Sequence, residues 1–416
     1  MIDLTLYPTG THIDGNGRLL VGGCSVSELA AQHGTPLGII DEGALRERAR
    51  HYRDAFESRH PDSLVLFASK AFPSASVIGV VSSEGCGVDV ASAGELAIAR
   101  AGGADPSRMV FHGNAKSDDD IRSALDARVG FVVIDNSDDI DRLSRHATSP
   151  VPVLLRVSPA VSASTHAAMM TGHDSSKFGI PSFQIAETIA RIRSEPMLDL
   201  QGLHAHIGSQ ILNLDQFEAE VEAISHLERF PVYDFGGGLG VRYIGSDSAP
   251  SIDEYAERLV SAVHRHLGTG VKIMIEPGRS MIAQCGVSAY RVVTVKHGVR
   301  THVAVDGGMS DNLEVALYGQ PFEPAIIDKV APDDTVDVVG QHCESGDTLV
   351  KDIALPHPEV GDVLTVPVTG AYCFTMHNNY NAALGMPWVF CRAGESRVAM
   401  RRQTMDELLA REMLQR

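Results

Sequence analysis

Short, continuously apolar segments recur along the first two thirds of the chain, and each ends in a polar residue or a glycine. We place eight of these segments at residues 64–70, 87–92, 109–114, 131–136, 151–157, 202–208, 232–238 and 273–278. Segments with helical periodicity follow most of them, such as residues 182–195 and 252–267. Apolar strands alternating with helices indicate a parallel sheet covered on both faces. Eight of them predict an α/β fold, a closed (β/α)8 barrel of the TIM type.

Two of the predicted helices begin with the pattern S-x-x-E, which is typical of a capping box. These are Ser92 with Glu95 and Ser251 with Glu254. We expect each serine and glutamate to satisfy backbone N–H groups in the first helical turn.

The pattern changes after Arg279, where short strands are broken by Gly, Asp and Pro without long helices between them. This is typical of an all-β domain. We therefore expect a barrel domain over residues 35–283 and a C-terminal all-β domain, a sandwich or barrel, which residues 1–34 would join to residues 284–416. Residues 404–415 are expected to form the last helix.

The composition adds an acidic balance, because 35 Lys+Arg stand against 53 Asp+Glu and give a net charge of −18. This excess argues against nucleic acid as a partner, since phosphate backbones require clustered basic residues. The longest charge-free run, residues 363–391, contains three asparagines and a histidine, so we expect no membrane span. Six scattered cysteines and the absence of a signal-like N-terminus favour the cytoplasm.

Active sites of such barrels lie at the carboxyl ends of the strands. The residues at those ends are Lys70, Asp89, His112, Asp135, Arg156, His206, glycines 236–238 and Glu276. So polar a set predicts an enzyme.

Lys70 has two interpretations. It could extend its charge to solvent, or, in an apolar barrel mouth, it could have a lowered pKa and form a Schiff base with a carbonyl group. The glycines after the seventh strand form a candidate phosphate site, since exposed backbone N–H groups can surround an anion. Glu276 could be solvated, or it could keep a pyridine nitrogen protonated.

His204 and His206 lie on one face of a strand and could form a metal pair. We prefer an interpretation without metal, in which His206 alone presents a flat ring to a cofactor. Cys343 and Glu344 fall in the β domain, so they would reach a barrel mouth by domain packing or from a second subunit. A buried structural thiol is the alternative for Cys343.

Ten strings in order along the chain resemble the diaminopimelate decarboxylase family, within the alanine-racemase-like (fold-type III) pyridoxal-phosphate enzymes. They are FASKAF, GVDVASAGELAIA, FHGNAKSD, THAAMMTGHDSSKFGI, HAHIGSQI, DFGGGLG, EPGRS, AVDGGMSDN, GQHCESGD and GAYCFTMHNNYN.

The resemblance implies an amino-acid decarboxylase with pyridoxal 5'-phosphate, a carboxy-lyase of lysine biosynthesis converting meso-diaminopimelate to L-lysine. It implies a homodimer with shared active sites, in which Cys343 of one subunit protonates the product carbanion in the other. Catalytic roles would fall to Lys70, Cys343 and His206. The cofactor would contact Lys70, Asp89, Arg156, His206, Ser209, Gly236, Gly237, Gly238, Glu276, Gly278, Arg279 and Tyr372. The substrate would contact Arg279, Glu314, Tyr318, Glu344 and Tyr372. Roles for His112, Asp135 and His173 are left open.

Glu314 departs from the family, whose members usually carry an arginine that holds the distal carboxylate of the substrate. Glu314 could point to solvent while another cation serves. Alternatively, the substrate could have a distal ammonium or neutral group, as in D- or L-lysine, ornithine or a larger biosynthetic amino acid.

The sequence leaves three further functions open. They are a pyridoxal-phosphate racemase, a non-catalytic homologue, and a metal hydrolase built on His204 and His206. The joint presence of Lys70, Glu276 and Cys343 speaks against a non-catalytic scaffold.

Overall fold

The computed structural model describes residues 2–158 and 176–413, which form two compact units. The first, here called the barrel unit, comprises Arg46–Val241 and Ser248–Met281. The second, the β unit, comprises Met1–Leu45, Arg242–Asp247 and Ile282–Arg416.

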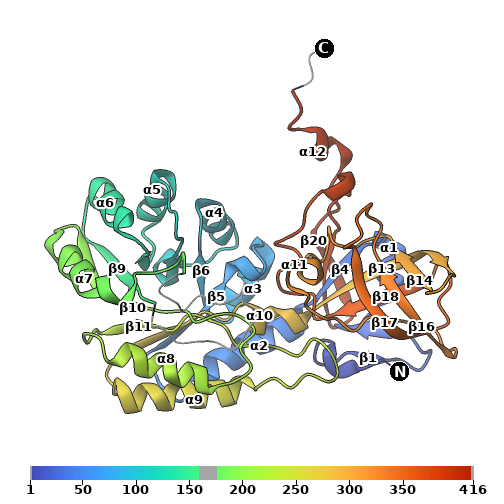
Figure 1. Cartoon of the computed structure of the whole chain (residues 1–416), viewed down its shortest axis with the longest axis horizontal. Helices are drawn as coiled ribbons and strands as arrows, with labels where there is room; N and C mark the ends of the chain where they lie inside the picture. Colours follow the sequence, from blue (N-terminus) through green and yellow to red (C-terminus); the bar gives the residue numbers. More distant parts are fainter. Residues whose placement is uncertain (1, 159–175, 414–416) are drawn as a thin grey trace. The chain divides into compact units, whose positions relative to one another are not determined.

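Eight parallel strands close the barrel unit in the order β10-β11-β12-β5-β6-β7-β8-β9 (Figure 1). They are β5 (Ser63–Ala68), β6 (Gly87–Val90), β7 (Met109–Phe111), β8 (Phe131–Ile134), β9 (Val151–Arg156), β10 (Leu198–His204), β11 (Val232–Asp234) and β12 (Lys272–Ile275). Each overlaps one of the eight apolar segments of the sequence, with β10 beginning four residues earlier than predicted, so the predicted (β/α)8 barrel is confirmed.

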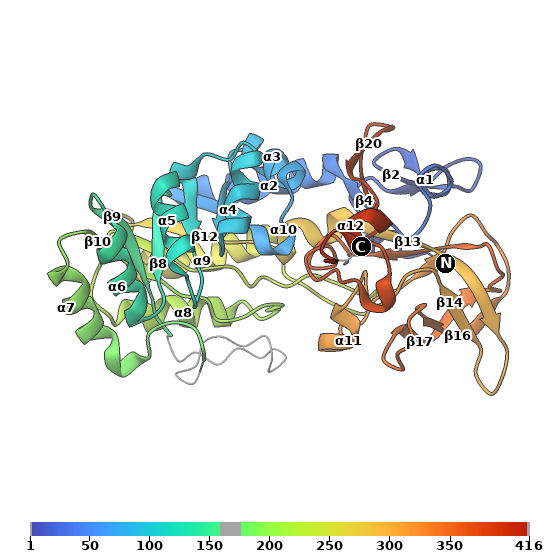
Figure 2. The same ribbon diagram turned by 90° about the horizontal axis from the view of Figure 1, so that it is seen from above.

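Helices cover the outside of these strands (Figure 2). They are α2 (Glu42–Glu57), α3 (Ala75–Ser83), α4 (Ala93–Ala101), α5 (Asp118–Ala127), α6 (Ser137–His146), α7 (Ile185–Ser194), α8 (Asp215–Ser225) and α9 (Ile252–His266), and the short α10 (Arg279–Ile282) follows β12.

The two expected capping boxes differ in outcome. At α9, Ser251 and Glu254 bond reciprocally to each other's backbone N–H, as predicted. At α4, the Ser92 side chain accepts from Glu95 N, but the Glu95 carboxylate accepts from Ala91 N instead. The serine is therefore a cap in both helices, while of these two helices α9 alone has the complete box.

Alternate residues of the strands point into the barrel and fill it. Leu64 and Leu66 of β5 pack in one buried cluster with Val110, Val133, Leu154, Val232 and Met274 from five other strands. The closed interior means that a ligand can be held only at an end of the barrel.

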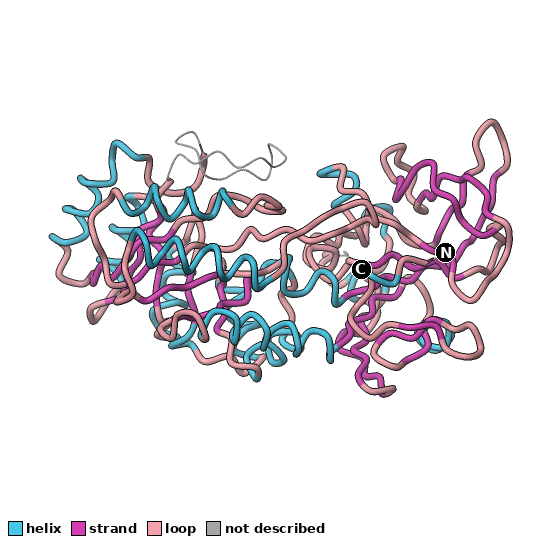
Figure 3. Tube along the Cα trace, turned by 90° about the horizontal axis from the view of Figure 1, so that it is seen from below, coloured by secondary structure: helices cyan, strands magenta, loops and turns pink. Residues whose placement is uncertain are grey.

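Strands, drawn in magenta in Figure 3, are the main regular structure of the β unit. Its main sheet runs β17-β16-β14-β13-β4-β19-β20, with β18 pairing β13 and β15, and a second sheet has the order β1-β2-β3. The strands are β1 (His12–Ile13), β2 (Leu19–Val21), β3 (Cys24–Ser25), β4 (Leu37–Asp41), β13 (Gly286–Lys296), β14 (His302–Val305), β15 (Ala325–Ile326), β16 (Asp333–Val339), β17 (Thr348–Pro356), β18 (Val363–Pro367), β19 (Trp388–Arg392) and β20 (Glu395–Met400).

Three short helices complete the β unit, namely α1 (Val26–His33), α11 (Glu314–Tyr318) and α12 (Met405–Leu409). The predicted all-β character of this region is confirmed, and the expected last helix is present in shorter form as α12. Across the described residues, every helix is too short or too polar to cross a lipid bilayer.

Candidate active site

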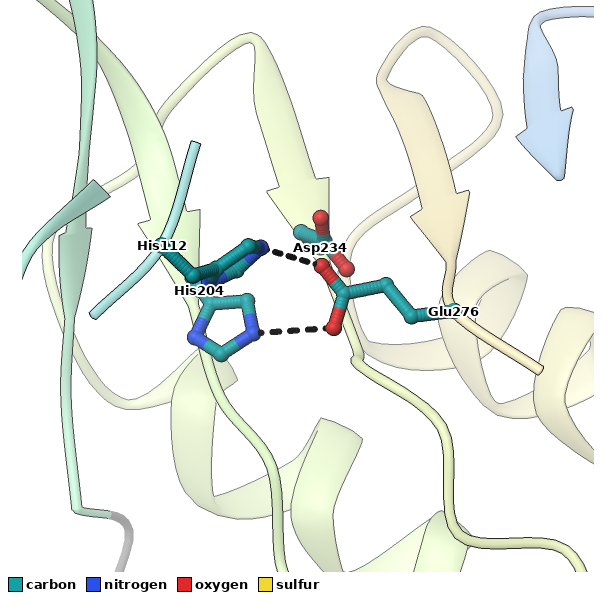
Figure 4. A group of neighbouring side chains, drawn as sticks. All are labelled: His112, His204, Asp234 and Glu276. Carbon is teal, nitrogen blue, oxygen red and sulfur yellow. Dashed lines mark ion pairs between the residues drawn. The ribbon is translucent and has the colours of Figure 1, made fainter. Parts of the chain in front are cut away.

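Polar side chains gather where the barrel strands end. His204 and Asp234 are the last residues of β10 and β11, while His112 and Glu276 come directly after β7 and β12. All four are buried, and one polar atom from each lies within 4.8 Å of those of the others (Figure 4).

Glu276 is the centre of this group. Its Oε1 lies 2.6 Å from His112 Nε2, and its Oε2 lies 3.5 Å from His204 Nε2. Burial raises the pKa of Glu276, but the two histidines outweigh it and hold that pKa well below its ordinary value. Glu276 is therefore a carboxylate although it is only 6% exposed.

The two histidines differ in charge. Burial lowers the pKa of His204 to about 3, so its ring is neutral at pH 7. Burial also acts to lower the pKa of His112, but the carboxylates of Glu276 and Asp89 raise it above its ordinary value. His112 is thus the cation that balances Glu276.

Two further carboxyl groups adjoin this pair. Burial raises the pKa of Asp89 to about 7, partly offset by His112, whose Nε2 lies 3.6 Å from Asp89 Oδ1. Burial and the neighbouring Glu276 raise the pKa of Asp234 well above its ordinary value. Burial beside Glu276 therefore favours the protonated, neutral form of Asp234.

The four clustered side chains include two carboxyl groups and two imidazoles, a combination that divalent metals accept. The separation of 2.6 Å between His112 and Glu276 fits an ion pair. It is shorter than the roughly 3.4 Å between two ligands that share a tetrahedral ion at 2.0–2.1 Å. The geometry therefore favours a carboxylate held by histidines, in which His204 takes part without His206.

The glycine loop after β11 is tied to this cluster by its backbone. Gly236 N donates to Asp234 Oδ1 (2.9 Å), and Glu276 N donates to Gly236 O (2.7 Å). A Cβ at Gly237 would lie 2.2 Å from Glu276 O, and one at Gly238 (φ +118°) would lie 2.6 Å from Gly208 O. Side chains are excluded here, so the backbone of the loop leaves room for an anion to approach it closely.

His206 lies beside the same loop, since Gly237 N donates to its Nδ1 at 3.2 Å. Burial, with the positive charges of Lys70 and Arg156, lowers the pKa of His206 well below its ordinary value. It therefore presents a neutral ring. Lys70 is exposed in the turn that follows β5 (Ser69–Ala71).

The next two predicted residues lie at the start of α10, where Gly278 directly precedes the helix and Arg279 is its first residue. A Cβ at Gly278 would lie 3.1 Å from Ala68 Cβ, so the chain approaches β5 closely there. Arg279 is buried, and its Nε donates to Ser209 Oγ at 3.4 Å. Arg279 and Ser209 thus form a polar pair beside the glycine loop.

Arg156 ends β9 and contacts Asp135, with Nη1 3.5 Å from Oδ2, and its guanidinium lies 4.5 Å from the centre of the Phe178 ring. Asp135 also accepts from Gly179 N at 2.9 Å. Asp135 is thereby placed to orient Arg156. His173 lies outside the described residues.

The string FHGNAKSD contains a residue that sequence reasoning missed. Lys116 is 2% exposed and donates from Nζ to Asp139 Oδ2 at 2.7 Å, and the same oxygen accepts from Asp135 N at 3.0 Å. This buried pair fixes the backbone that carries Asp135. In the sequence this pair is visible only as a lysine after a strand and an aspartate in the next helix. Many exposed ion pairs have the same pattern.

Other predicted residues fall in the β unit, where separate motifs meet. Cys343 N donates to Asn381 Oδ1 at 2.9 Å, and Tyr380 Oη donates to Glu344 Oε2 at 3.4 Å. Cys343 and Glu344 are both exposed, so the alternative of a buried structural thiol is wrong. Tyr372 has a left-handed backbone (φ 64°), a conformation that is uncommon for non-glycine residues.

Glu314 and Tyr318 begin and end α11. Glu314 is 1% exposed and accepts from Tyr243 Oη at 3.4 Å. The first explanation of this residue, that it points to solvent, is therefore wrong.

The comparisons with known proteins agree with this arrangement. Residues 42–283 match the family described as "Pyridoxal-dependent decarboxylase, pyridoxal binding domain". The diaminopimelate decarboxylase of Actinosynnema pretiosum subsp. auranticum is 41% identical, over 99% of this chain and 96% of that protein. That of Bacillus subtilis (strain 168) is 38% identical over 95% of both chains.

Solved structures are similar over the whole chain. The crystal structure of diaminopimelate decarboxylase from M. jannaschi superposes with a TM-score of 0.92 at 27% identity, covering 98% of each chain. That of the Helicobacter pylori enzyme complexed with L-lysine gives 0.87 at 28% identity, covering 92% of this chain and 98% of the other.

Fold, site and comparisons define a carboxy-lyase of the pyridoxal-phosphate-dependent class. A carboxylate with a depressed pKa, a neutral ring and a glycine cradle are what that cofactor requires of a protein. The chain belongs to the diaminopimelate decarboxylase family.

Proposed function

We propose that this chain decarboxylates meso-diaminopimelate to L-lysine. The observation that carries the proposal is the buried Glu276 carboxylate held by His112 and His204 beside a glycine loop, in a chain 41% identical to a diaminopimelate decarboxylase. The lysine bound in a similar structure has the chemistry of the expected product.

Pyridoxal phosphate, when bound, supplies an electron sink for the electrons left when the bond between Cα and the carboxylate breaks. Glu276, whose pKa is held well below its ordinary value, would keep a proton on the pyridine nitrogen of the bound cofactor. His206 would present its neutral ring to the cofactor, and the loop of glycines 236–238, which has no side chains to fill it, would receive the phosphate. Lys70 would hold the cofactor by its amine.

The remaining barrel residues complete the pocket. Ser209, Gly278 and Arg279 would surround the phosphate or the substrate carboxylate, which is supported by the hydrogen bond from Arg279 to Ser209. Asp89, next to the last residue of β6, and Arg156, the last residue of β9, would border the cofactor.

The β unit supplies the proton donor. Cys343 is exposed, and its thiol would deliver a proton to Cα after carbon dioxide leaves, while Glu344 meets the distal end of the substrate. We infer a homodimer with shared active sites, in which Cys343, Glu344 and Tyr372 of one protomer serve the barrel of its partner. We expect the enzyme in the cytoplasm.

A lysine- or ornithine-type amino acid is the second candidate substrate. It is favoured by Glu314, a buried carboxylate in α11 beside Tyr318. A carboxylate near the distal end of the pocket would attract an ammonium and repel a second carboxylate, by roughly 2–5 kcal/mol when both are desolvated.

Release of carbon dioxide from meso-diaminopimelate, compared with both enantiomers of lysine and of ornithine, tests the proposal. Efficient turnover of diaminopimelate alone supports it and removes the second candidate. Preference for a monocarboxylate overturns the diaminopimelate assignment. Glu314→Gln is the informative variant, because it should raise diaminopimelate turnover only if the carboxylate repels that substrate.

A further inference from the structure

Asp234 lies between the two parts of the barrel site that the proposed function uses separately. It is the last residue of β11, it is fully buried, and it directly precedes the glycine loop. A carboxyl oxygen of Asp234 lies within 4.8 Å of Glu276 and of the ring nitrogens of His112 and His204 (Figure 4).

One oxygen of Asp234 is committed to the loop. Gly236 N donates to Oδ1 at 2.9 Å, which fixes the turn into the left-handed conformation of Gly236 (φ +59°). In the same turn, the carbonyl oxygen of Gly236 accepts a hydrogen bond from Glu276 N at 2.7 Å. The loop is thus tied to Glu276 through the backbone and to Asp234 through Oδ1.

The second oxygen of Asp234, Oδ2, is buried and has no hydrogen-bond partner among the described residues. Nor does any basic side chain of those residues form an ion pair with Asp234, whereas Glu276 has two histidines. A second bare carboxylate so close to Glu276 would be repelled, so the stable form of Asp234 is the acid, with a hydrogen to give.

We propose that Asp234 is a positioning residue of the cofactor site, whose neutral carboxyl group joins the glycine loop to the Glu276 carboxylate and holds that carboxylate in place. Burial and Glu276 raise the pKa of Asp234 well above its ordinary value, in agreement with this geometry. The inference rests on the proposed placement of the cofactor.

The test compares Asp234→Asn and Asp234→Ala in the full-length chain, with pyridoxal phosphate as the probe. Asparagine keeps an oxygen for Gly236 N and a donor for Glu276, and it is neutral, whereas alanine removes both contacts. Glu220→Gln is the matched control, since Glu220 is also fully buried, also has a raised pKa, and makes no bond to the loop.

We expect Asp234→Ala to weaken cofactor binding, measured by absorbance titration of the apoprotein, and to lower kcat, each by about 10-fold or more, with little change in KM. Asp234→Asn should restore both quantities to within about 3-fold of wild type, and Glu220→Gln should match wild type.

An Asp234→Asn variant that loses more than about 10-fold in affinity overturns the inference, because a negative charge would then be required. This result decides the question even if Asp234→Ala does not fold. Wild-type affinity and kcat in a folded Asp234→Ala variant overturn it too. A wild-type chain that does not bind pyridoxal phosphate overturns the proposed function as well.

Discussion

His112 Nε2 lies 2.6 Å from Glu276 Oε1, and this ion pair is buried at the mouth of the barrel. The two residues come from strand ends β7 and β12, which are not neighbours in the barrel. Each partner shifts the pKa of the other so that its charged form is favoured, since the pKa of His112 is raised and that of Glu276 is lowered. A ring nitrogen placed against Glu276 would therefore meet a full negative charge.

Replacing His112 with glutamine should weaken the stabilisation of the Glu276 carboxylate. Without the cation, burial of Glu276 is less well compensated, so its pKa rises and the acid limb of the pH–rate profile moves to higher pH. We expect kcat at pH 7 to fall about 10-fold, or roughly 1.4 kcal/mol in the barrier. Steady-state kinetics between pH 5 and pH 9 measure both changes.

His51→Gln provides the control for His112→Gln. His51 forms an ion pair of similar length with Asp253 (2.7 Å), but both groups are largely exposed on the outside of the barrel unit. Exposed pairs contribute little, so this variant should keep the wild-type profile. An unchanged acid limb in His112→Gln would contradict the role assigned to the buried pair.

The sequence predicted the barrel because each strand is apolar on both faces and ends in a polar residue or glycine. It also placed Lys70, Glu276 and the glycine loop at one end, since parallel strands share their direction. It could not pair His112 with Glu276 or assign a role to Asp234, because such contacts depend on the curvature that closes the sheet. The neutral state of Asp234 depends on burial among distant strands, which no local pattern encodes.

Glu314 shows the same limit in the β unit. As the one charged residue of the short helix α11 it could equally have faced solvent, and its burial against Tyr243 depends on residues 242–247 joining the β unit. The exposure of Cys343 likewise depends on loop packing, here against Asn381.

Lys70→Ala should abolish the absorbance band of the bound cofactor and lower kcat by about 1,000-fold or more, because the amine that carries the cofactor is lost. Lys272→Ala is the control, since Lys272 begins β12 at the opposite end of the barrel, 3.8 Å from Asp62. It should keep both the band and the activity. A persisting band in Lys70→Ala would contradict the assignment of Lys70.

Gly237→Ala should reduce cofactor affinity by about 10-fold or more, because the new Cβ would lie 2.2 Å from Glu276 O and one of the two segments must move. Gly270→Ala adds the same methyl group where no atom lies within 4 Å, so it should bind the cofactor normally. Absorbance titration of both apoproteins gives the comparison. Equal affinities would show that the loop does not need its close approach to Glu276.

Two inactive variants should restore activity when mixed, if the active site is shared between protomers. Lys70→Ala and Cys343→Ala, unfolded together and refolded, form mixed dimers in which one site has both native residues. We expect about a quarter of wild-type kcat from an equal mixture, and none from either variant alone. If light scattering shows that the mixture is dimeric and no activity is recovered, a shared site is excluded.

Asp311→Asn should change how the stability of the β unit depends on pH. Asp311 is 2% exposed, and burial raises its pKa from 3.8 to about 7. The folded state then holds a proton that the unfolded state releases, so this residue lowers the stability of the wild type as the pH rises from about 4 to about 7. Asparagine removes that dependence. The free energy of unfolding of the variant, relative to that of the wild type, should therefore increase by roughly 2–3 kcal/mol when the pH is raised from 5 to 8.

Trp388, the single tryptophan, is buried in the β unit, so its fluorescence during urea unfolding follows this unit. Asp333→Asn, at an exposed position of β16, should show no such gain, and parallel curves for all three proteins would refute the prediction.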